Sequence, residues 1–307
     1  MAKKVLVIGG SYFAGRVFAM IAAREAGFEL TLLNRGHYSM AHLPNVREIR
    51  CDRHDGAALR QLPAEEYDAI VDFCAYSPED VRELLTALPG KYGRYILLSS
   101  ADVYERDGDG PRDEYTELLR RQPTGPAGEY MFGKVLTEQA ALELCELREI
   151  PLTILRPAFI YGPYNYAPRE SWFVKQIVQG KPVPVPMDAR AKFQFVYVKD
   201  VARAIIACIN DKRSAGKAYN LSAPEVLDYP AFVETLKKVS DIPFTTVDVT
   251  VEQAMEQRLP LPFPLLPGED ELFAGHKICH ELGLEYTPFV EGMDKAFQAF
   301  KLVCSEE

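Results

Sequence analysis

Residues 5–15 read VLVIGGSYFAG, a hydrophobic run that passes directly into a glycine-rich turn. Residues 5–9 have the pattern of a buried strand, and residues 13–26 have the pattern of a helix. Glycine permits a sharp turn and lets backbone N–H groups approach a pyrophosphate, while the helix N-terminus adds partial positive charge. Strand, glycine loop and helix in this order predict a dinucleotide-binding unit rather than an ordinary tight turn.

The alternation of strand and helix continues along the chain. Aliphatic runs with no polar alternation are typical of strands that are covered on both faces of a parallel sheet. The pattern therefore predicts an α/β fold, a doubly wound parallel sheet of the Rossmann type. Further strands are expected at residues 29–33, 68–73, 95–99, 153–156 and 194–198, and helices at residues 78–88, 130–149 and 200–210.

Proline is unevenly distributed, with seven residues before Ile150 and 15 after it. The clusters at 182–186 and 260–267 are incompatible with helix interiors or central strands. We therefore expect a smaller, loop-rich substrate lobe in the C-terminal part, with helices near 229–239 and 289–303. The predicted division is a dinucleotide-binding domain of residues 1–163 and 192–222, and a substrate lobe of residues 164–191 and 223–307.

Composition narrows the class of protein. The 307 residues are 48% hydrophobic and carry a net charge of −9, which is ordinary for a globular protein and does not favour a nucleic-acid partner. We find no apolar run long enough to span a bilayer and no signal peptide at the start. Six scattered cysteines predict reduced thiols and a cytoplasmic protein. The segment 276–280 holds two histidines and one cysteine, too few to predict a metal site.

The end of the second predicted strand bears on cofactor choice. An NAD site of this type carries a carboxylate there to bind the ribose 2′-hydroxyl. This chain has Asn34 followed by Arg35. A guanidinium pairs with a 2′-phosphate and no carboxylate repels it, so the sequence favours NADP over NAD.

Tyr130 and Lys134 stand four residues apart, on one face of the predicted helix. A nearby ammonium stabilises a phenolate and lowers the pKa of tyrosine, which makes it a usable general acid or base. Ser99 and Ser100 end the preceding strand, where a hydroxyl can hold a substrate oxygen against the tyrosine. Ser100, Tyr130 and Lys134 are therefore the predicted catalytic residues.

With these features the chain resembles the extended short-chain dehydrogenase/reductase family. Within that family it is similar to the NAD(P)-dependent epimerase/dehydratase group, of the UDP-glucose 4-epimerase type. The resemblance rests on motifs in the family order, spread over residues 5 to about 225. These motifs are residues 9–15, 52–55, 99–104, 130–134, 156–163 and 195–202.

The resemblance implies that Ser100 orients the substrate, Tyr130 moves the proton, and Lys134 holds the nicotinamide ribose. Asp52 and Arg53 would lie beside the adenine. The full predicted cofactor site is Gly9, Ser11, Tyr12, Phe13, Gly15, Asn34, Arg35, Asp52, Arg53, Cys74, Ala75, Tyr76, Ser99, Tyr130, Lys134, Pro157 and Ala158. The predicted substrate residues are Ser100, Phe159, Tyr164, Asn165 and Arg169, and no metal ligands are predicted.

Some positions depart from the family pattern. Tyr12 replaces a glycine of the phosphate loop, and Phe193 stands where sugar-nucleotide members often carry an arginine for the diphosphate. Lys192, Arg190 or Arg169 could take over that arginine's role.

Three functions stay open at this level. The first is an NAD(P)-dependent epimerase or dehydratase that acts on a secondary alcohol or ketone of a sugar or sugar nucleotide. The second is an NADPH-dependent carbonyl reductase, which the Asn34–Arg35 pair favours. The third is a non-catalytic nucleotide-binding or RNA-binding member of the same fold, since relatives with altered glycine loops resemble chloroplast stem-loop RNA-binding proteins. The family also implies a homodimer, through the helices near 78–88 and 130–149.

Overall fold

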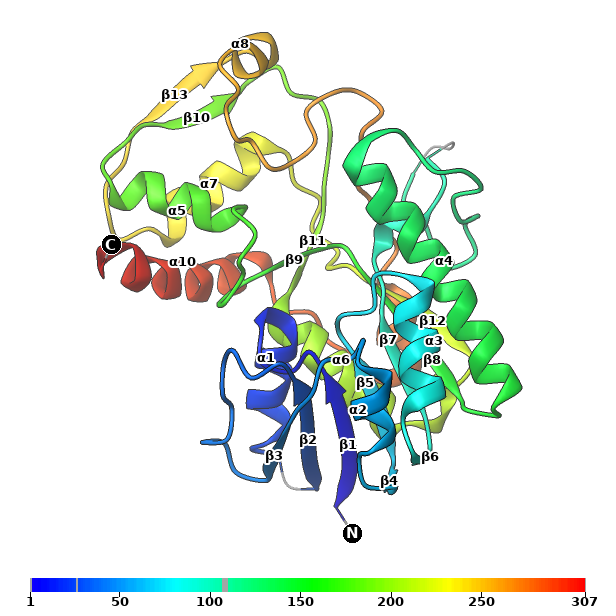
Figure 1. The fold of residues 1–307 in the computed structure, drawn as a ribbon. Coiled ribbons are helices and arrows are strands. Elements are labelled where there is room, and N and C mark those ends of the chain that lie inside the picture. Colours follow the sequence, from blue (N-terminus) through cyan, green and yellow to red (C-terminus); the bar gives the residue numbers. More distant parts are fainter. Residues whose placement is uncertain (1, 26, 107–109, 307) are drawn as a thin grey trace.

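A seven-stranded parallel sheet forms the centre of the molecule (Figure 1). The computed structural model describes residues 2–25, 27–106 and 110–306. The chain first builds one half of the sheet outward from its first strand, then crosses over and builds the other half, as in a doubly wound fold. From edge to edge the strands are β12 (Lys217–Leu221), β8 (Leu152–Pro157), β7 (Tyr95–Leu98), β5 (Ala69–Asp72), β1 (Lys3–Ile8), β2 (Phe28–Asn34) and β3 (Val46–Arg50).

Alternate side chains of β1 enter two separate hydrophobic layers. Val5 and Val7 pack on the side covered by α1 (Phe13–Ala22) and α6 (Val198–Asn210). Leu6 and Ile8 pack on the side covered by α3 (Pro78–Ala87) and α4 (Gly125–Leu147). Both faces of the central strands are thus buried, which explains their continuous aliphatic sequence.

Smaller elements complete this part of the chain. A short helix, α2 (Gly56–Arg60), packs against α3, and β4 (Glu65–Tyr67) pairs with β6 (Gly90–Tyr92). Two 3₁₀ turns, η1 (Ala101–Val103) and η2 (Lys212–Ser214), follow β7 and α6. Within the described ranges, every helix is too short or too polar to cross a membrane.

The C-terminal elements gather beyond the carboxyl ends of the strands (Figure 1). They contain two small parallel sheets, β9 with β11 and β10 with β13. Pro184 and Pro186 lie in one of these two-stranded sheets, where proline is tolerated. The bounds are β9 (Phe159–Tyr161), α5 (Glu170–Val178), β10 (Val183–Pro186), β11 (Phe195–Tyr197), α7 (Tyr229–Val239), β13 (Thr246–Val249), α8 (Val251–Glu256), α9 (His276–Leu282) and α10 (Phe289–Glu306).

The doubly wound parallel sheet and its flanking helices are confirmed, with shifted ends, but one predicted strand lies outside the sheet. The strand expected at residues 194–198 is β11, which pairs with β9, and the edge of the central sheet is formed by β12, where no strand was predicted. The helix expected from residue 130 begins five residues earlier, because Gly125 adopts φ +83° and Pro126 occupies the first turn. The first helix ends at Ala22, and Ala26 lies outside the described residues. The division into two domains stays a prediction. Within it, α9 contacts β12 and α6, so part of the 223–307 segment returns to the sheet.

A buried ionic network fixes the carboxyl end of β5. Asp72 is fully buried and accepts two hydrogen bonds from Arg53, at 2.8 and 2.9 Å. Tyr95 Oη donates to the same carboxylate at 2.8 Å, and Arg53 also donates to the carbonyl of Asp80. The arginine and its hydrogen bonds hold the pKa of Asp72 below its ordinary value, although burial opposes this. The network joins β5, β7, α3 and the segment after β3.

We expect Asp72→Ala to lower the free energy of unfolding by about 3–5 kcal/mol, because it removes the carboxylate that accepts two hydrogen bonds from the buried Arg53 guanidinium and leaves only the more distant Asp80, at 3.6 Å, to offset its charge. Chemical denaturation of the purified protein measures this change. Glu79→Ala, which breaks an exposed ion pair with Arg82, is the control and should change stability by less than about 1 kcal/mol. Equal effects of the two substitutions would show that the network does not stabilise the fold.

Candidate active site

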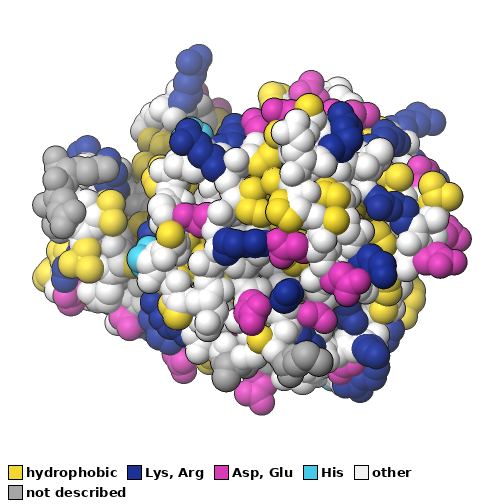
Figure 2. Space-filling model, turned by 60° about the horizontal axis from the view of Figure 1, so that its bottom comes forward, with side chains coloured by type: hydrophobic (Ala, Val, Ile, Leu, Met, Phe, Trp, Pro, Cys, Tyr) yellow, Lys and Arg dark blue, Asp and Glu magenta, His cyan; other side chains and the backbone are white. Residues whose placement is uncertain are grey.

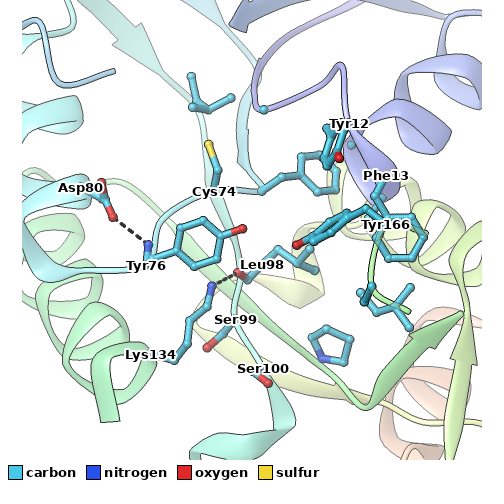
Figure 3. A pocket seen from close by; sticks show the side chains of 18 of the residues that line it. Tyr12, Phe13, Cys74, Tyr76, Asp80, Leu98, Ser99, Ser100, Lys134 and Tyr166 are labelled. Carbon is cyan, nitrogen blue, oxygen red and sulfur yellow. Dashed lines mark hydrogen bonds between the residues drawn. The ribbon is translucent and has the colours of Figure 1, made fainter. Parts of the chain in front are cut away.

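A cavity of about 1490 Å³ lies at the carboxyl ends of the central strands (Figure 3). All the predicted cofactor residues line it except Ala75, which is buried behind the wall. Of the predicted substrate residues, Ser100, Phe159, Asn165 and Arg169 also line it. Residues from seven separate segments of the chain therefore meet in one space, as the parallel sheet requires.

The glycine loop between β1 and α1 forms one wall. Gly9 has φ +84°, a backbone conformation that favours glycine. A Cβ on Gly15 would lie 2.3 Å from the Gly9 carbonyl oxygen, so only glycine allows α1 to approach the loop this closely. The first N–H groups of α1 have no partner within the helix and face the end of the sheet, an arrangement that suits an anion.

Side chains after β2 and β3 form the second wall. Arg35 is exposed and lines the cavity, whereas Asn34 Oδ1 accepts a hydrogen bond from the backbone of Gly36 at 2.7 Å. Asp52 is exposed and accepts from the backbone N–H of His54. Arg53 reaches the cavity, but its guanidinium is already bonded to Asp72. Of the charged side chains at this wall, Asp52 and Arg35 are therefore more accessible to a ligand than Arg53.

Lys134 enters the cavity from α4. Its Nζ donates to the carbonyls of Ala75 at 2.8 Å and Leu98 at 3.1 Å, and it lies 4.7 Å from the centre of the Tyr76 ring. The side chain is 2% exposed, and burial lowers its pKa to about 8. Both carbonyls come from the ends of central strands or the turns that follow them, so the sheet itself positions the ammonium.

Tyr130 and Ser100 face the same space. Tyr130 lines the cavity with 43% of its surface exposed, while Ser100 Oγ donates to Asp102 Oδ2 at 3.0 Å. Desolvation in the cavity wall and the Asp102 carboxylate raise the pKa of Tyr130 to about 12, and the hydrogen bond with Ser100 opposes this rise. The Lys134 ammonium is bonded to two backbone carbonyls in this structure, and its effect on the pKa of Tyr130 stays a prediction.

The substrate end lies between η1 and the C-terminal elements. Arg169 stacks over the Phe159 ring at 4.9 Å, and Asn165 Nδ2 donates to both oxygens of Glu170. The predicted residue Tyr164 does not reach the cavity. It lines a smaller groove beside α1, where the Arg16 guanidinium lies 4.7 Å from its ring.

Phe193 has a structural place. It is fully buried and stacks on Phe263 with ring centres 4.7 Å apart. Of the three cations that could replace the family arginine, Arg169 is the one among the described cavity-lining residues. Lys192 and Arg190 are exposed elsewhere.

Several cavity residues escaped the sequence analysis. Asp102 stands two residues after Ser100, so this short spacing could have predicted that Asp102 lies at the site. Glu271 comes from the C-terminal part, where it is 5% exposed and forms an ion pair with Arg106. Burial and the charge of Asp102 raise the pKa of Glu271 to about 7. Nothing near Glu271 in the sequence indicates this position. Tyr38, Tyr166 and Phe273 were also missed.

The described residues contain no group of three His, Cys, Asp or Glu side chains placed to hold a metal ion. His276 and His280 lie with ring centres 5.5 Å apart on α9.

Comparison with known proteins places these features in context. Residues 5–222 match the model of the NAD dependent epimerase/dehydratase family. A chloroplast stem-loop binding protein of 41 kDa from Arabidopsis thaliana is 29% identical over 78% of this chain, and the alignment spans 64% of that protein's length. A dTDP-glucose 4,6-dehydratase from Streptomyces niveus is 26% identical over 76% of this chain and 77% of its own.

Solved structures share the fold. The structure of UDP-glucuronic acid 4-epimerase from Bacillus cereus, in complex with UDP-glucuronic acid and NAD, superposes with a TM-score of 0.77. The identity is 18%, over 98% of this chain and 99% of that one. An epimerase from Methanothermobacter thermautotrophicus superposes with a TM-score of 0.80 at 20% identity, over 100% of this chain and 95% of that one.

The depressed pKa of Lys134 predicts a pH-dependent stability. In the unfolded chain the lysine pKa is about 10.4. Between about pH 8 and pH 10 the unfolded chain therefore holds a proton that the folded protein has lost, so the free energy of unfolding rises with pH, by up to about 3 kcal/mol. Urea denaturation across this interval measures the rise. Lys134→Met should abolish it, and Lys91→Met, at an 84% exposed side chain, should not. An unchanged pH dependence in Lys134→Met would contradict the assignment.

Proposed function

The chain belongs to the NAD-dependent epimerase/dehydratase family, and on that premise we propose that it is an NAD(P)-dependent epimerase or dehydratase acting on a sugar or sugar nucleotide. The observation that carries the proposal is the convergence of Ser100, Tyr130 and Lys134 on the cavity that contains the glycine loop. Two of the similar proteins, the dTDP-glucose 4,6-dehydratase and the UDP-glucuronic acid 4-epimerase, act on nucleotide sugars according to their names, which supports this substrate class.

The described residues fit a nicotinamide dinucleotide. The tight Gly9–Gly15 contact lets α1 begin directly at the glycine loop, where the N–H groups of its first turn can bind a pyrophosphate. Ser99 Oγ is buried at the cavity wall and has no hydrogen-bond partner among the described residues, which is unusual without a ligand. When bound, the nicotinamide ring accepts and returns a hydride.

The catalytic residues divide the remaining work. Ser100 Oγ holds the substrate oxygen, and Tyr130 Oη takes its proton as the carbon loses a hydride. Lys134 keeps a positive charge beside the tyrosine and the cofactor ribose. Because the Tyr130 pKa is raised to about 12 in this arrangement, we infer that the phenolate forms when the Ser100 hydroxyl turns from Asp102 towards Tyr130 and donates to it, with the charge of Arg169 also lowering that pKa. The neutral phenol is the form that returns the proton.

Cofactor choice is a finer proposal. Arg35 is exposed at the cavity and no carboxylate takes the usual place at the end of β2, which supports NADP. The family description supports NAD. We propose that the site accepts both, with Arg35 increasing affinity for the 2′-phosphate.

The other functions are not favoured. The name of the Arabidopsis relative suggests RNA binding, but the Ser100, Tyr130 and Lys134 set is complete here. On the face shown in Figure 2, basic and acidic side chains are interspersed among the described residues rather than gathered by sign. Such a surface does not suit a phosphate backbone. A reductase would use the same three residues, so these residues do not distinguish it from an epimerase or dehydratase.

Two further properties are proposals. We propose a homodimer formed through α3 and α4, which pack side by side, because α4 exposes Leu136, Leu142 and Leu147. The scattered free cysteines support a cytoplasmic location.

Tyr130→Phe should reduce turnover by at least about 100-fold while leaving dinucleotide affinity within about twofold, because it removes the proton carrier and keeps the ring. Conversion of dTDP-glucose and UDP-glucuronic acid, followed by NMR, measures the first effect, and cofactor titration measures the second. Tyr115→Phe, at an 84% exposed tyrosine outside the cavity, is the matched control. Full activity of Tyr130→Phe would remove Tyr130 as the acid and base.

Arg35→Ala should weaken NADPH binding by about 10- to 100-fold and leave NADH binding nearly unchanged, since a charged hydrogen bond contributes about 1.5–3 kcal/mol. Titration with each nucleotide measures the two affinities. Arg82→Ala, an exposed arginine of α3, provides the control. Parallel loss of both nucleotides would mean that Arg35 does not read the 2′-phosphate.

A further inference from the structure

Three tyrosines from three separate loops form a row along the cavity. Tyr12 belongs to the glycine loop, Tyr38 follows β2, and Tyr166 lies between β9 and α5. The Tyr12 ring stacks on Tyr38 with centres 5.6 Å apart and contacts Tyr166 at 5.0 Å. All three line the cavity, yet they stay 48%, 50% and 61% exposed. We call these residues the tyrosine row.

The row joins the glycine loop to the substrate end of the molecule. Phe13 meets the Tyr166 ring edge-on at 6.0 Å, and Arg16 covers Tyr164 at 4.7 Å. Phe13 and Tyr164 have φ values of +33° and +69°, which non-glycine residues adopt only at a cost of about 1–3 kcal/mol. The aromatic contacts therefore hold two loops in conformations that they would not favour alone.

The opposite wall carries a fourth tyrosine. Figure 3 shows the hydroxyls of Tyr76 and Tyr166 pointing toward one another across the pocket. Burial and the neighbouring Tyr166 raise the pKa of Tyr76 above its ordinary value, so the Tyr76 hydroxyl is neutral and able to donate. Tyr76 also covers the Lys134 ammonium. Tyr76 and Tyr166 thus face one another across the same cavity that Arg35 and Tyr130 line.

We propose that the tyrosine row is a clasp that closes over the pyrophosphate of the bound dinucleotide and retains it between turnovers. The proposal rests on the proposed function. A dinucleotide that reaches from Arg35 to Tyr130 must pass beneath Tyr12, so its release requires Tyr12 to separate from Tyr166 or Tyr38. Each aromatic pair contributes about 0.5–1.5 kcal/mol beyond its buried area. A glycine at position 12 would make neither contact.

Retention of the dinucleotide between turnovers distinguishes an epimerase or dehydratase from a reductase. In a redox-neutral cycle the substrate alcohol would give a hydride to the cofactor and a proton to Tyr130. An epimerase would return both to the ketone carbon and oxygen, whereas a dehydratase would keep the ketone, expel water, and return the hydride to the carbon that lost its hydroxyl. The cofactor ends as it began and has no need to leave. A reductase consumes one reduced cofactor per turnover and must exchange it. The clasp therefore favours an epimerase or dehydratase over a reductase.

The test is the rate of dinucleotide release. The full-length protein is loaded with NADH, or with NADPH if that binds more tightly, and an excess of the oxidised form is added while the fluorescence of the bound nucleotide is followed. Tyr12→Ala and Tyr166→Ala should each speed release by about 2- to 10-fold. The fold-increase in the release rate of the double variant should be smaller than the product of the two single fold-increases, because the Tyr12 and Tyr166 rings form one shared contact. Tyr115→Ala is the matched control and should release at the wild-type rate.

Failure of the clasp and failure of the proposed function would give different results. Unchanged release in both single variants, or fully multiplicative effects in the double variant, would overturn the clasp and leave the proposed function intact. Tyr12→Phe keeps the ring and should release slowly, so fast release from this variant would also contradict a clasp made by ring contact. Failure of the wild-type protein to bind either reduced nucleotide would overturn the proposed function, and the clasp with it.

Discussion

The approach of Gly15 to the Gly9 carbonyl sets how closely α1 can begin beside the end of β1. A single Cβ at position 15 would lie 2.3 Å from that oxygen, so any larger residue would push the helix away from the sheet. The N–H groups of the first helical turn, the cavity wall and the position of Tyr12 all depend on this contact. Tyr12 stands between these two glycines and lines the cavity.

Buried ions then hold the strand ends that face the cavity. Asp72 ties β5 to Arg53 and to Tyr95 of β7, and the Glu138 carboxylate of α4 binds Arg156 of β8 at 2.7 and 3.0 Å. Such pairs pay a large desolvation cost, so they add little net stability over an apolar core, but breaking one leaves an unpaired charge. Their effect is geometric, since the Glu138–Arg156 pair fixes α4, which carries Tyr130 and Lys134, against the sheet, and the Asp72 network fixes β5, β7 and α3 to one another.

The sequence predicted the parts that follow from local pattern. Aliphatic runs marked the central strands, and the spacing of Tyr130 and Lys134 placed both on one helix. Short strands such as β9 and β10 were missed, because each pairs with a partner far along the chain and one is rich in proline. Glu271 and Phe273 are held at the cavity by isolated β-bridges, Glu271 to Phe193 and Phe273 to Arg112. Both partners are distant in the sequence, so no local pattern predicts these contacts. The pKa of Tyr130 also depends on burial and on Asp102, which the spacing of Tyr130 and Lys134 does not reveal.

The central claim is that this cavity binds a nicotinamide dinucleotide and keeps it. The most direct measurement is to purify the protein without added cofactor, denature it, and identify and quantify any released nucleotide by mass spectrometry. We predict close to one equivalent of a nicotinamide dinucleotide per chain. A protein that releases no nucleotide, and then binds neither NADH nor NADPH when these are supplied, would contradict the account.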